Sequence, residues 1–304
     1  MIYSITDRCN LDCRGCYAKL LHTSGRPELT HEQAAQLLEE ARDLGVSVIL
    51  LAGGEPLIRP QLLDLTARTP QVLFLLFTNG SLIDDATVSS LRRQKHVIPI
   101  LSLEGFESLT DERRGQGTYR HVMAAMGRLQ RARLLFGTSI TLTSQTFESA
   151  TDEQFLRGLI DKGCRIFFYI NYVPVAPGTD SLQPTLEQVA LLRKRLEGHR
   201  ASLPALFVAF PDEEVKLGGC LAAGRGFVHI NAYGDVEPCP FSPYSDSNVS
   251  AMSLEQALDS PLFRRILTSG VVLDESDGQC ALWKRRDWVA SLCDRSGKRS
   301  TDPS

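Results

Sequence analysis

Apolar runs of strand length alternate with amphipathic segments from the N-terminus to about residue 175. The strand-like runs cover residues 2–6, 46–52, 72–78, 97–103, 136–143 and 165–173. Helical spacing of apolar positions fills the segments between them, at about 31–44, 60–68, 84–94, 118–132 and 152–162. Strands joined by crossover helices run parallel, and strands buried on both faces are apolar throughout, as VSVILLA and VLFLLF are. The pattern predicts an α/β fold, a partial (β/α)6 TIM-like barrel, because six units are too few for an eightfold barrel.

Four segments with a hydroxyl residue followed three positions later by glutamine mark predicted helix starts. In such a capping box the hydroxyl accepts from the N3 amide and the glutamine reaches back. The boxes begin at Thr30, Thr151, Thr185 and Ser253.

The composition and the periodicity of the chain change after about residue 205. Gly, Pro, Asp and Ser become dense, helical periodicity weakens, and four of the eight cysteines appear. Small loop-rich modules have little core and usually need a metal or bridges. We therefore predict a barrel over 1–205, a small loop-rich C-terminal iron–sulfur module over 206–293 and a flexible tail over 294–304.

Composition and charge exclude several classes of protein. The chain is 43% hydrophobic and 23% charged with a net charge of −3, which favours neither nucleic acid nor an anionic membrane surface. It has no long apolar run and no export signal, so we expect a cytoplasmic protein. Cysteines in that compartment are reduced, and clustered thiolates bind metal more often than they form disulfides.

Three cysteines follow the first strand, at the sheet edge where such folds bind ligands. Cys9, Cys13 and Cys16 have the spacing C-x3-C-x2-C. Three thiolates can bind three irons of a [4Fe–4S] cluster and leave the fourth iron open to another ligand. Zinc is the alternative, although closed zinc sites use four protein ligands.

The segment CNLDCRGCYA resembles the signature of the radical S-adenosylmethionine (SAM) superfamily, in which Tyr17 is also common. Gly15 departs from that signature, because an aromatic residue usually stands there; we expect a freer backbone and a missing packing contact. The resemblance implies a [4Fe–4S] cluster on the three cysteines and bound SAM. It further implies reductive cleavage of SAM to a 5′-deoxyadenosyl radical that abstracts hydrogen from a substrate.

Polar residues at the next strand ends are expected to bind SAM. Gly53, Gly54 and Glu55 combine glycines that allow close approach with a carboxylate that can accept from an ammonium; a Gly-Gly turn with an exposed glutamate is the alternative. The superfamily's GGEP motif binds the SAM amino group at this position. By the same resemblance we assign Asn79, Ser102 and Glu104 to the cofactor site, although relatives tend to carry aspartate at the last position. Asn79 is equally compatible with simple turn chemistry.

Further polar residues have weaker assignments. The segment 111–119, DERRGQGTY, resembles a loop that places Arg113 and Arg114 near a cofactor or substrate carboxylate, and a solvated charge run is the alternative. Asn171 is a possible ligand contact. Cys164 stands alone at a strand start and is expected to be a buried core thiol.

The C-terminal cysteines carry a second resemblance. Residues 220–239 have the spacing C-x13-G-x4-C, with a predicted hairpin between, and resemble the opening of the SPASM or twitch extension that carries auxiliary iron–sulfur clusters. The remaining cysteines suffice for one further cluster. We expect its ligands to be Cys220, Cys239 and Cys280, with Cys293 as the fourth; a zinc ribbon using the same residues is the alternative.

The sequence therefore predicts a radical SAM enzyme acting on a peptide or protein side chain or on a small-molecule precursor. No catalytic acid or base stands out. The resemblance suggests flavodoxin or ferredoxin as the electron donor. Peptide-modifying relatives commonly have a leader-binding module ahead of the barrel, and we expect none within this chain. The alternative function is an iron–sulfur electron-transfer or scaffold protein that does not turn over SAM.

Overall fold

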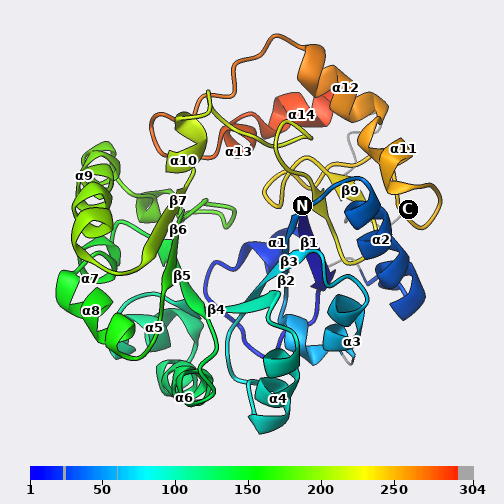
Figure 1. Cartoon of the computed structure of the whole chain (residues 1–304). Coiled ribbons are helices and arrows are strands. Elements are labelled where there is room, and N and C mark those ends of the chain that lie inside the picture. Colours follow the sequence, from blue (N-terminus) through cyan, green and yellow to red (C-terminus); the bar gives the residue numbers. More distant parts are fainter. Residues whose placement is uncertain (23–24, 60, 294–304) are drawn as a thin grey trace.

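The chain folds around one curved sheet with helices on its outer face (Figure 1). The computed structural model describes residues 1–22, 25–59 and 61–293, so the tail predicted at 294–304 lies outside the described residues. Within those ranges the strand order is β7-β6-β5-β4-β3-β2-β1-β8-β9, and β1 to β7 are parallel to their neighbours. The strands are β1 Ile2–Thr6, β2 Val48–Gly53, β3 Leu73–Thr78, β4 Val97–Leu103, β5 Gly137–Leu142, β6 Ile166–Asn171, β7 Leu206–Phe210, β8 His229–Ile230 and β9 Val236–Glu237.

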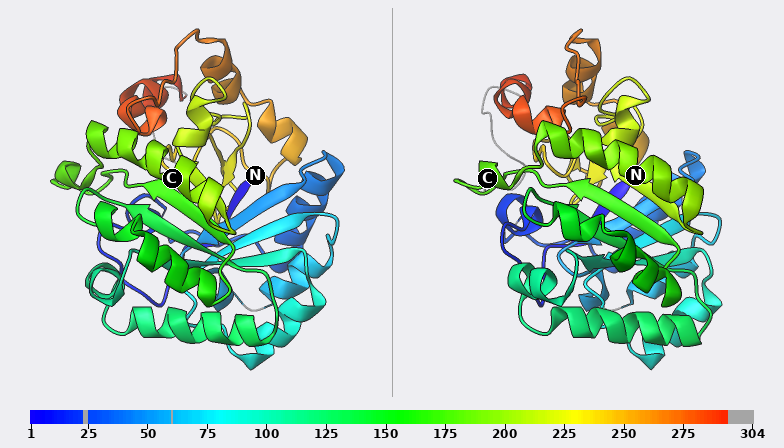
Figure 2. Two further views of the ribbon diagram at one scale, coloured as in Figure 1. Left: turned by 60° about the vertical axis from the view of Figure 1, so that its left-hand side comes forward. Right: turned by 90° about the vertical axis from the view of Figure 1, so that its left-hand side faces the viewer.

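The helices between successive parallel strands cover the outside of this sheet, and the C-terminal helices lie along its open side (Figures 1 and 2). None of the described helices is long and apolar enough to cross a membrane. The helices are α1 Tyr17–Leu21, α2 His31–Asp43, α3 Leu62–Ala67, α4 Asp85–Arg93, α5 Glu107–Arg114, α6 Thr118–Arg131, α7 Phe147–Ala150, α8 Glu153–Asp161, α9 Leu186–Ser202, α10 Asp212–Val215, α11 Leu254–Leu258, α12 Pro261–Thr268, α13 Ala281–Lys284 and α14 Arg286–Leu292, with 3₁₀ turns at Pro56–Ile58 and Asp180–Leu182.

Three of the four predicted capping boxes are confirmed, at Thr30, Thr185 and Ser253. The fourth is wrong by one residue. Asp152 is the N-cap of α8, and its carboxylate accepts from the Phe155 N–H at 2.8 Å. Thr151 instead donates its hydroxyl to the Phe147 carbonyl at 2.8 Å. An aspartate is at least as good an N-cap as a threonine and takes the position when both are present.

The predicted α/β partial barrel is confirmed, and the sheet has one more parallel strand than the six we expected. β7 pairs in parallel with β6 after the crossover helix α9. Its residues alternate in exposure, from Leu206 at 58% exposed to Phe207 at 1%. An edge strand of this kind is short and only half-buried, so it lacks the long apolar run that marked the other strands.

The predicted hairpin between Cys220 and Cys239 is present, and it joins the sheet. β8 runs parallel to β1, with Ile2 opposite His229, and β9 pairs antiparallel to β8. Segments from the two ends of the chain therefore lie side by side. The C-terminal module is attached to the barrel through β8, which pairs with the barrel strand β1.

Candidate functional site

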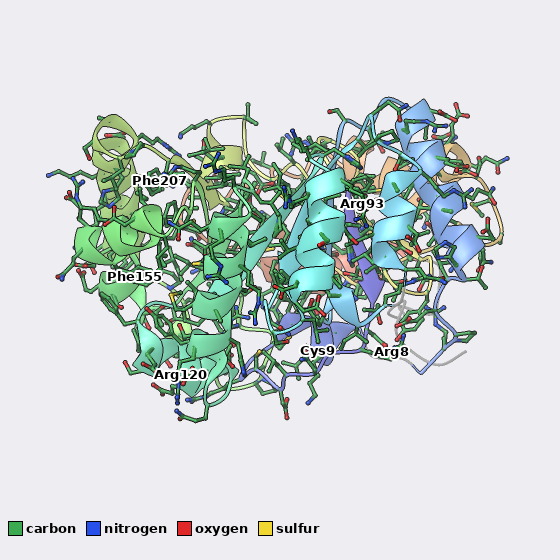
Figure 3. The ribbon with its side chains drawn as sticks, turned by 60° about the horizontal axis from the view of Figure 1, so that its bottom comes forward. Arg8, Cys9, Arg93, Arg120, Phe155 and Phe207 are labelled. Atoms are coloured by element: carbon green, nitrogen blue, oxygen red, sulfur yellow. The ribbon has the colours of Figure 1, made fainter. Side chains whose placement is uncertain are left out.

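The three cysteines of the first loop are free thiols on one turn after β1. Cys9 is exposed, and Cys13 and Cys16 are half-buried; Figure 3 shows Cys9 beside Arg8 on this loop. The Cys16 N–H donates to the Cys13 carbonyl at 3.3 Å. Burial chiefly raises the pKa of Cys9 and of Cys13, and the nearby Cys16 thiol acts in the same direction. The loop gathers three thiols at the carboxyl edge of the sheet, as three corners of a [4Fe–4S] cluster require.

Gly15 has the freer backbone that the sequence suggested, with φ +68°. A Cβ at this position would lie 2.7 Å from the Tyr172 hydroxyl oxygen, so the Tyr172 ring occupies the space beside it. That hydroxyl donates to Thr179 Oγ1 at 3.0 Å. Tyr172, which directly follows β6, therefore packs beside Gly15, the loop position at which the superfamily signature usually has an aromatic residue.

Gly53 and Gly54 allow the end of β2 to pack closely against residues 6–8, which lead into the cysteine loop. The Gly54 N–H donates to the Thr6 carbonyl, and the Glu55 N–H donates to the Arg8 carbonyl, both at 2.8 Å. A Cβ would lie 2.3 Å from the Thr6 oxygen at Gly53 and 2.1 Å from the Arg8 oxygen at Gly54. Only glycine permits this approach, because contacts below 3 Å force the backbone apart.

The Glu55 carboxylate is buried, so the alternative of an exposed glutamate is wrong. It accepts from the Leu57 N–H at 3.1 Å, the Thr78 hydroxyl at 2.8 Å and the Asn79 N–H at 2.7 Å. Burial raises the pKa of Glu55, and these three donors oppose that shift. The Asn79 side chain in turn donates to Asn10 Oδ1 at 2.8 Å, within the cysteine loop. This network joins the ends of β2 and β3 to the loop.

Glu104 lies fully buried between two arginines from α5. Its Oε1 accepts from Arg113 Nη1 at 2.5 Å and from Arg114 Nε at 2.7 Å. The arginine side chains are 17% and 12% exposed, so the solvated charge run is the wrong alternative. Glu104 Oε2 has no hydrogen-bond partner among the described residues. The Arg113 carbonyl accepts from the Arg14 N–H at 2.8 Å, which places this cluster against the cysteine loop.

The other polar residues predicted near the site have protein partners. The Ser102 hydroxyl lies 3.3 Å from that of Ser139 on β5. Asn171 Nδ2 donates to the Gly278 carbonyl at 2.9 Å. Asn171 thereby connects the end of β6 to the C-terminal module.

A second group of thiols lines an interior cavity of about 580 Å³. Cys220, Cys239 and Cys280 form part of its wall. Burial chiefly raises the pKa of Cys239, and its hydrogen bond with Cys280 and its proximity to Cys220 add to the shift. Cys293 is buried at the C-cap of α14 and does not line this cavity. The structure thus brings three of the four C-terminal cysteines together.

Two carboxyl groups beside Cys220 were not identified from the sequence. Oxygens of Glu214 and Glu275 lie within 4.8 Å of each other and of the Cys220 sulfur. Burial, with the neighbouring Glu214 carboxyl, raises the pKa of Glu275 to about 8. Its Oε1 accepts from the Ala281 N–H at 3.0 Å, whereas Oε2 has no partner among the described residues. In the sequence both glutamates sit in short acidic runs that resemble solvated loops.

The rest of the cavity wall is mostly apolar, with Ser47 and Asn171 as polar exceptions. Phe77, Phe168 and Phe210 from three strands contribute rings, and no described lysine or arginine side chain lines it. Tyr17 follows Cys16 directly, and its ring lies 4.9 Å from that of Phe241, two residues after Cys239. Both rings also line the cavity.

Comparison with known families identifies the class. The model of the radical SAM superfamily matches residues 3–157, about half of the chain, and this chain belongs to that superfamily. Its members use a [4Fe–4S] cluster and SAM, and the chain is a radical SAM enzyme. The three free thiols at Cys9, Cys13 and Cys16 fit such a cluster.

Similarity to individual proteins extends along most of the chain. It is 26% identical over 297 residues to pre-heme d1 synthase of Dinoroseobacter shibae, covering 86% of this chain and 73% of that protein. It is 27% identical over 256 residues to the mycofactocin maturase MftC of Mycolicibacterium smegmatis, covering 80% and 64%. The structure of Streptococcus suis SuiB bound to S-adenosylmethionine superposes with a TM-score of 0.76 at 19% identity, over 93% of this chain and 70% of that one. That superposition supports the shared fold.

Proposed function

We propose that Cys9, Cys13 and Cys16 hold the [4Fe–4S] cluster and that the apolar cavity holds the substrate of this radical SAM enzyme. When bound, the cluster supplies the electron that cleaves SAM reductively to methionine and a 5′-deoxyadenosyl radical, which abstracts a substrate hydrogen. Three free thiols lie on one loop, and hydrogen bonds connect this loop to the ends of β2 and β3. This arrangement is the main support for the proposal.

The chain's own residues position SAM. A carboxylate has about four lone-pair sites, and three protein donors already use Glu55, so one site is left for the SAM ammonium. Gly53 and Gly54 bring the backbone close to the loop. Asn79, Ser102 and Glu104 complete the proposed cofactor contacts, and Glu104 also orients Arg113 and Arg114.

We also propose an auxiliary [4Fe–4S] cluster on Cys220, Cys239 and Cys280. The thiols share one cavity wall, and reduced thiolates are the ligands that such clusters require. Cys293, which the sequence suggested as the fourth ligand, does not line that cavity, so we propose the Glu275 carboxyl beside Cys220 as the donor for the open corner. The division into a barrel over 1–205 and this module over 206–293 remains a prediction; β7 lies just beyond that boundary.

The cavity chemistry favours a substrate group that is apolar and not anionic. Its walls are rings and aliphatic side chains, two carboxyls face it, and no described lysine or arginine side chain lines it. Apart from the Met1 ammonium, the described lining offers an anion no positive charge, and burying an unpaired charge is costly. We therefore propose a peptide or protein side chain as the substrate, the class on which two relatives, both PqqA peptide cyclases, act according to their names.

A small-molecule precursor is the second candidate. The AdoMet-dependent heme synthase of Methanosarcina barkeri is 23% identical over 310 residues, covering 92% of this chain and 86% of that protein. This coverage extends through the C-terminal module. We propose a cytoplasmic location, where thiols such as these stay reduced. The resemblance to the superfamily suggests flavodoxin or ferredoxin as the electron donor.

The test starts with iron and sulfide analysis after anaerobic reconstitution, together with 5′-deoxyadenosine formation from SAM and dithionite. We expect about eight irons per chain, which corresponds to two [4Fe–4S] clusters. Cys16→Ala should abolish 5′-deoxyadenosine, and Cys164→Ala, a thiol remote from both groups, should not. Iron without 5′-deoxyadenosine would support the electron-transfer or scaffold alternative.

Deuterium transfer distinguishes the substrate classes. Incubation with perdeuterated peptides should place deuterium in 5′-deoxyadenosine if a peptide side chain is the substrate. Transfer only from a deuterated tetrapyrrole would overturn the peptide proposal and leave the SAM chemistry intact.

A further inference from the structure

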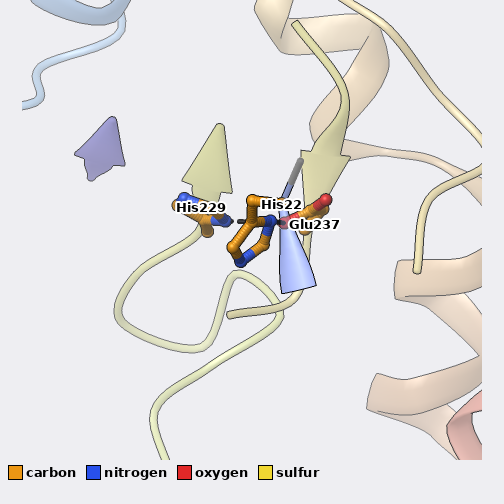
Figure 4. Close-up of side chains that lie close together, drawn as sticks. All are labelled: His22, His229 and Glu237. Atoms are coloured by element: carbon orange, nitrogen blue, oxygen red, sulfur yellow. Dashed lines mark hydrogen bonds and ion pairs between the residues drawn. The ribbon is translucent and has the colours of Figure 1, made fainter. Parts of the chain in front are cut away.

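Two buried histidines and a glutamate converge at the junction of the barrel and the C-terminal hairpin (Figure 4). His22 is the C-cap residue of α1, His229 lies in β8 and Glu237 in β9. Their side chains are 0–4% exposed. Glu237 Oε2 lies 2.7 Å from His229 Nδ1 and 3.7 Å from His22 Nδ1. One nitrogen or oxygen of each residue thus lies within 4.8 Å of the other two.

The atom of each residue that points away from this centre has its own partner. The outer contacts are His22 Nε2 to the Pro240 carbonyl at 2.7 Å, His229 Nε2 to the Ser4 hydroxyl at 2.8 Å, and Glu237 Oε1 to Asn231 Nδ2 at 2.9 Å. Protein metal sites use this arrangement, because outer partners fix the tautomer and the direction of each ligand. The contacts aim two ring nitrogens and a carboxylate oxygen at one point.

His22 presents an unprotonated ring nitrogen to the Glu237 carboxylate. A carbonyl only accepts, so His22 Nε2 carries the ring proton and the neutral ring presents the Nδ1 lone pair. This Nδ1 has no hydrogen-bond partner among the described residues and faces a carboxylate oxygen. Two acceptors facing each other in a dry interior are unfavourable unless a cation lies between them.

A proton and a metal ion are the two cations to consider. Burial chiefly lowers the pKa of His22, and it lowers that of His229 to about 3. Neutral imidazole is the form that binds metals. The convergence of two ring nitrogens and a carboxylate oxygen within 4.8 Å of one another matches a metal ion better than a single proton.

We propose that His22, His229 and Glu237 bind a divalent transition-metal ion at this junction, and that zinc is the ion the donor set favours. Imidazole and carboxylate ligands suit zinc, and three protein ligands leave its fourth tetrahedral position to a water molecule. The Ser4 hydroxyl can accept or donate, so His229 can shift its proton to Nε2 and free Nδ1 for the metal. The outer contacts remain in place.

The position of the site gives it a structural role. His22 closes the helix that starts directly after Cys16, and Glu237 stands two residues before Cys239. Zinc at this point fixes the distance between the two cysteine groups. The inference is independent of the substrate and of SAM turnover.

The first test is zinc analysis of the full chain after iron–sulfur reconstitution. We expect about one zinc per chain in the wild type, as a mononuclear site requires. His22→Gln and Glu237→Gln should lose it while retaining their iron. His199→Gln is the matched control, because His199 is also buried and its Nε2 lies 3.3 Å from a carbonyl, that of Thr151. Ser4→Ala should weaken zinc binding about 10–100-fold by removing an outer partner.

A second test uses the wild type alone and does not depend on variant folding. Chelation should lower the thermal unfolding temperature and added zinc should restore it, because a ligand bound to the folded state stabilises it. Cys220→Ser should retain the zinc, which separates this site from the thiols. The proposal is overturned if reconstituted wild type holds less than about a tenth of a zinc per chain. Zinc retained by both His22→Gln and Glu237→Gln, or an unfolding temperature that zinc does not change, also overturns it.

Discussion

Glu55 Oε2 accepts a hydrogen bond from the Asn79 N–H at 2.7 Å, and this contact fastens the end of β2 to the end of β3. The other oxygen accepts from Thr78 and Leu57. A residue at the strand ends thereby has a structural task in addition to its proposed contact with the SAM ammonium.

Glu55→Gln should weaken both roles. The amide NH₂ turns toward one of three donors, and a buried donor left unpaired costs about 1–3 kcal/mol. We expect that loss in urea unfolding, together with weaker SAM binding by anaerobic equilibrium dialysis. Asp64→Asn, on the outer helix α3, is the comparison. Unchanged stability and SAM affinity in the Gln variant would contradict this role.

The order of strands and helices was predictable because strands buried on both faces and capped helices have recognisable patterns within a few consecutive residues. Arg113 and Arg114 show what such short patterns do not reveal. A pair of charges resembles a solvated surface, and only the fold places the buried Glu104 against them. His22 and His229 are likewise far apart in sequence and meet only because β8 pairs with β1.

Gly54→Ala should disturb the cysteine loop. The added Cβ would lie 2.1 Å from the Arg8 carbonyl oxygen, and both partners are backbone, so the loop has to move. We expect loss of the first cluster's iron and no 5′-deoxyadenosine. Gly158→Ala is the control: its Cβ meets nothing within 4 Å inside α8, and it should stabilise the chain by roughly 0.5–1 kcal/mol. Full iron content in Gly54→Ala would refute the packing argument.

Glu104→Leu should be strongly destabilising. It leaves two largely buried guanidiniums without their carboxylate, and breaking a buried pair costs about 3–5 kcal/mol. Anaerobic urea unfolding followed by circular dichroism measures the change. Glu112→Gln removes an exposed partner of Arg14 at 3.9 Å and should cost less than about 1 kcal/mol. Equal costs for the two variants would contradict the buried cluster.

Cys164 should resist alkylation in the folded, cluster-free protein. Burial raises the pKa of this thiol to about 12, and thiolate is the reactive form. At pH 8 with iodoacetamide, mass spectrometry should find the exposed Cys9 modified and Cys164 unmodified until urea is added. Modification of both at similar rates would show that this part of the core is open.

Cys293→Ser should separate the two proposals for the auxiliary cluster's fourth ligand. Cys220, Cys239 and Cys280 supply three corners by themselves, so we expect the variant to retain about four auxiliary irons. Cys280→Ser should lose them. Loss of the auxiliary iron in Cys293→Ser as well would establish Cys293 as the required fourth ligand.

The pairing of β1 with β8 has a consequence for how the chain is made. Ser4 and His229, which meet across this pair, are 225 residues apart. During synthesis β1 can pair with β2 early, but its other edge stays open until β8 leaves the ribosome. An unpaired strand edge invites mispairing with other chains. The β1 edge beside the first three cysteines therefore completes its pairing long after β1 itself has been synthesised.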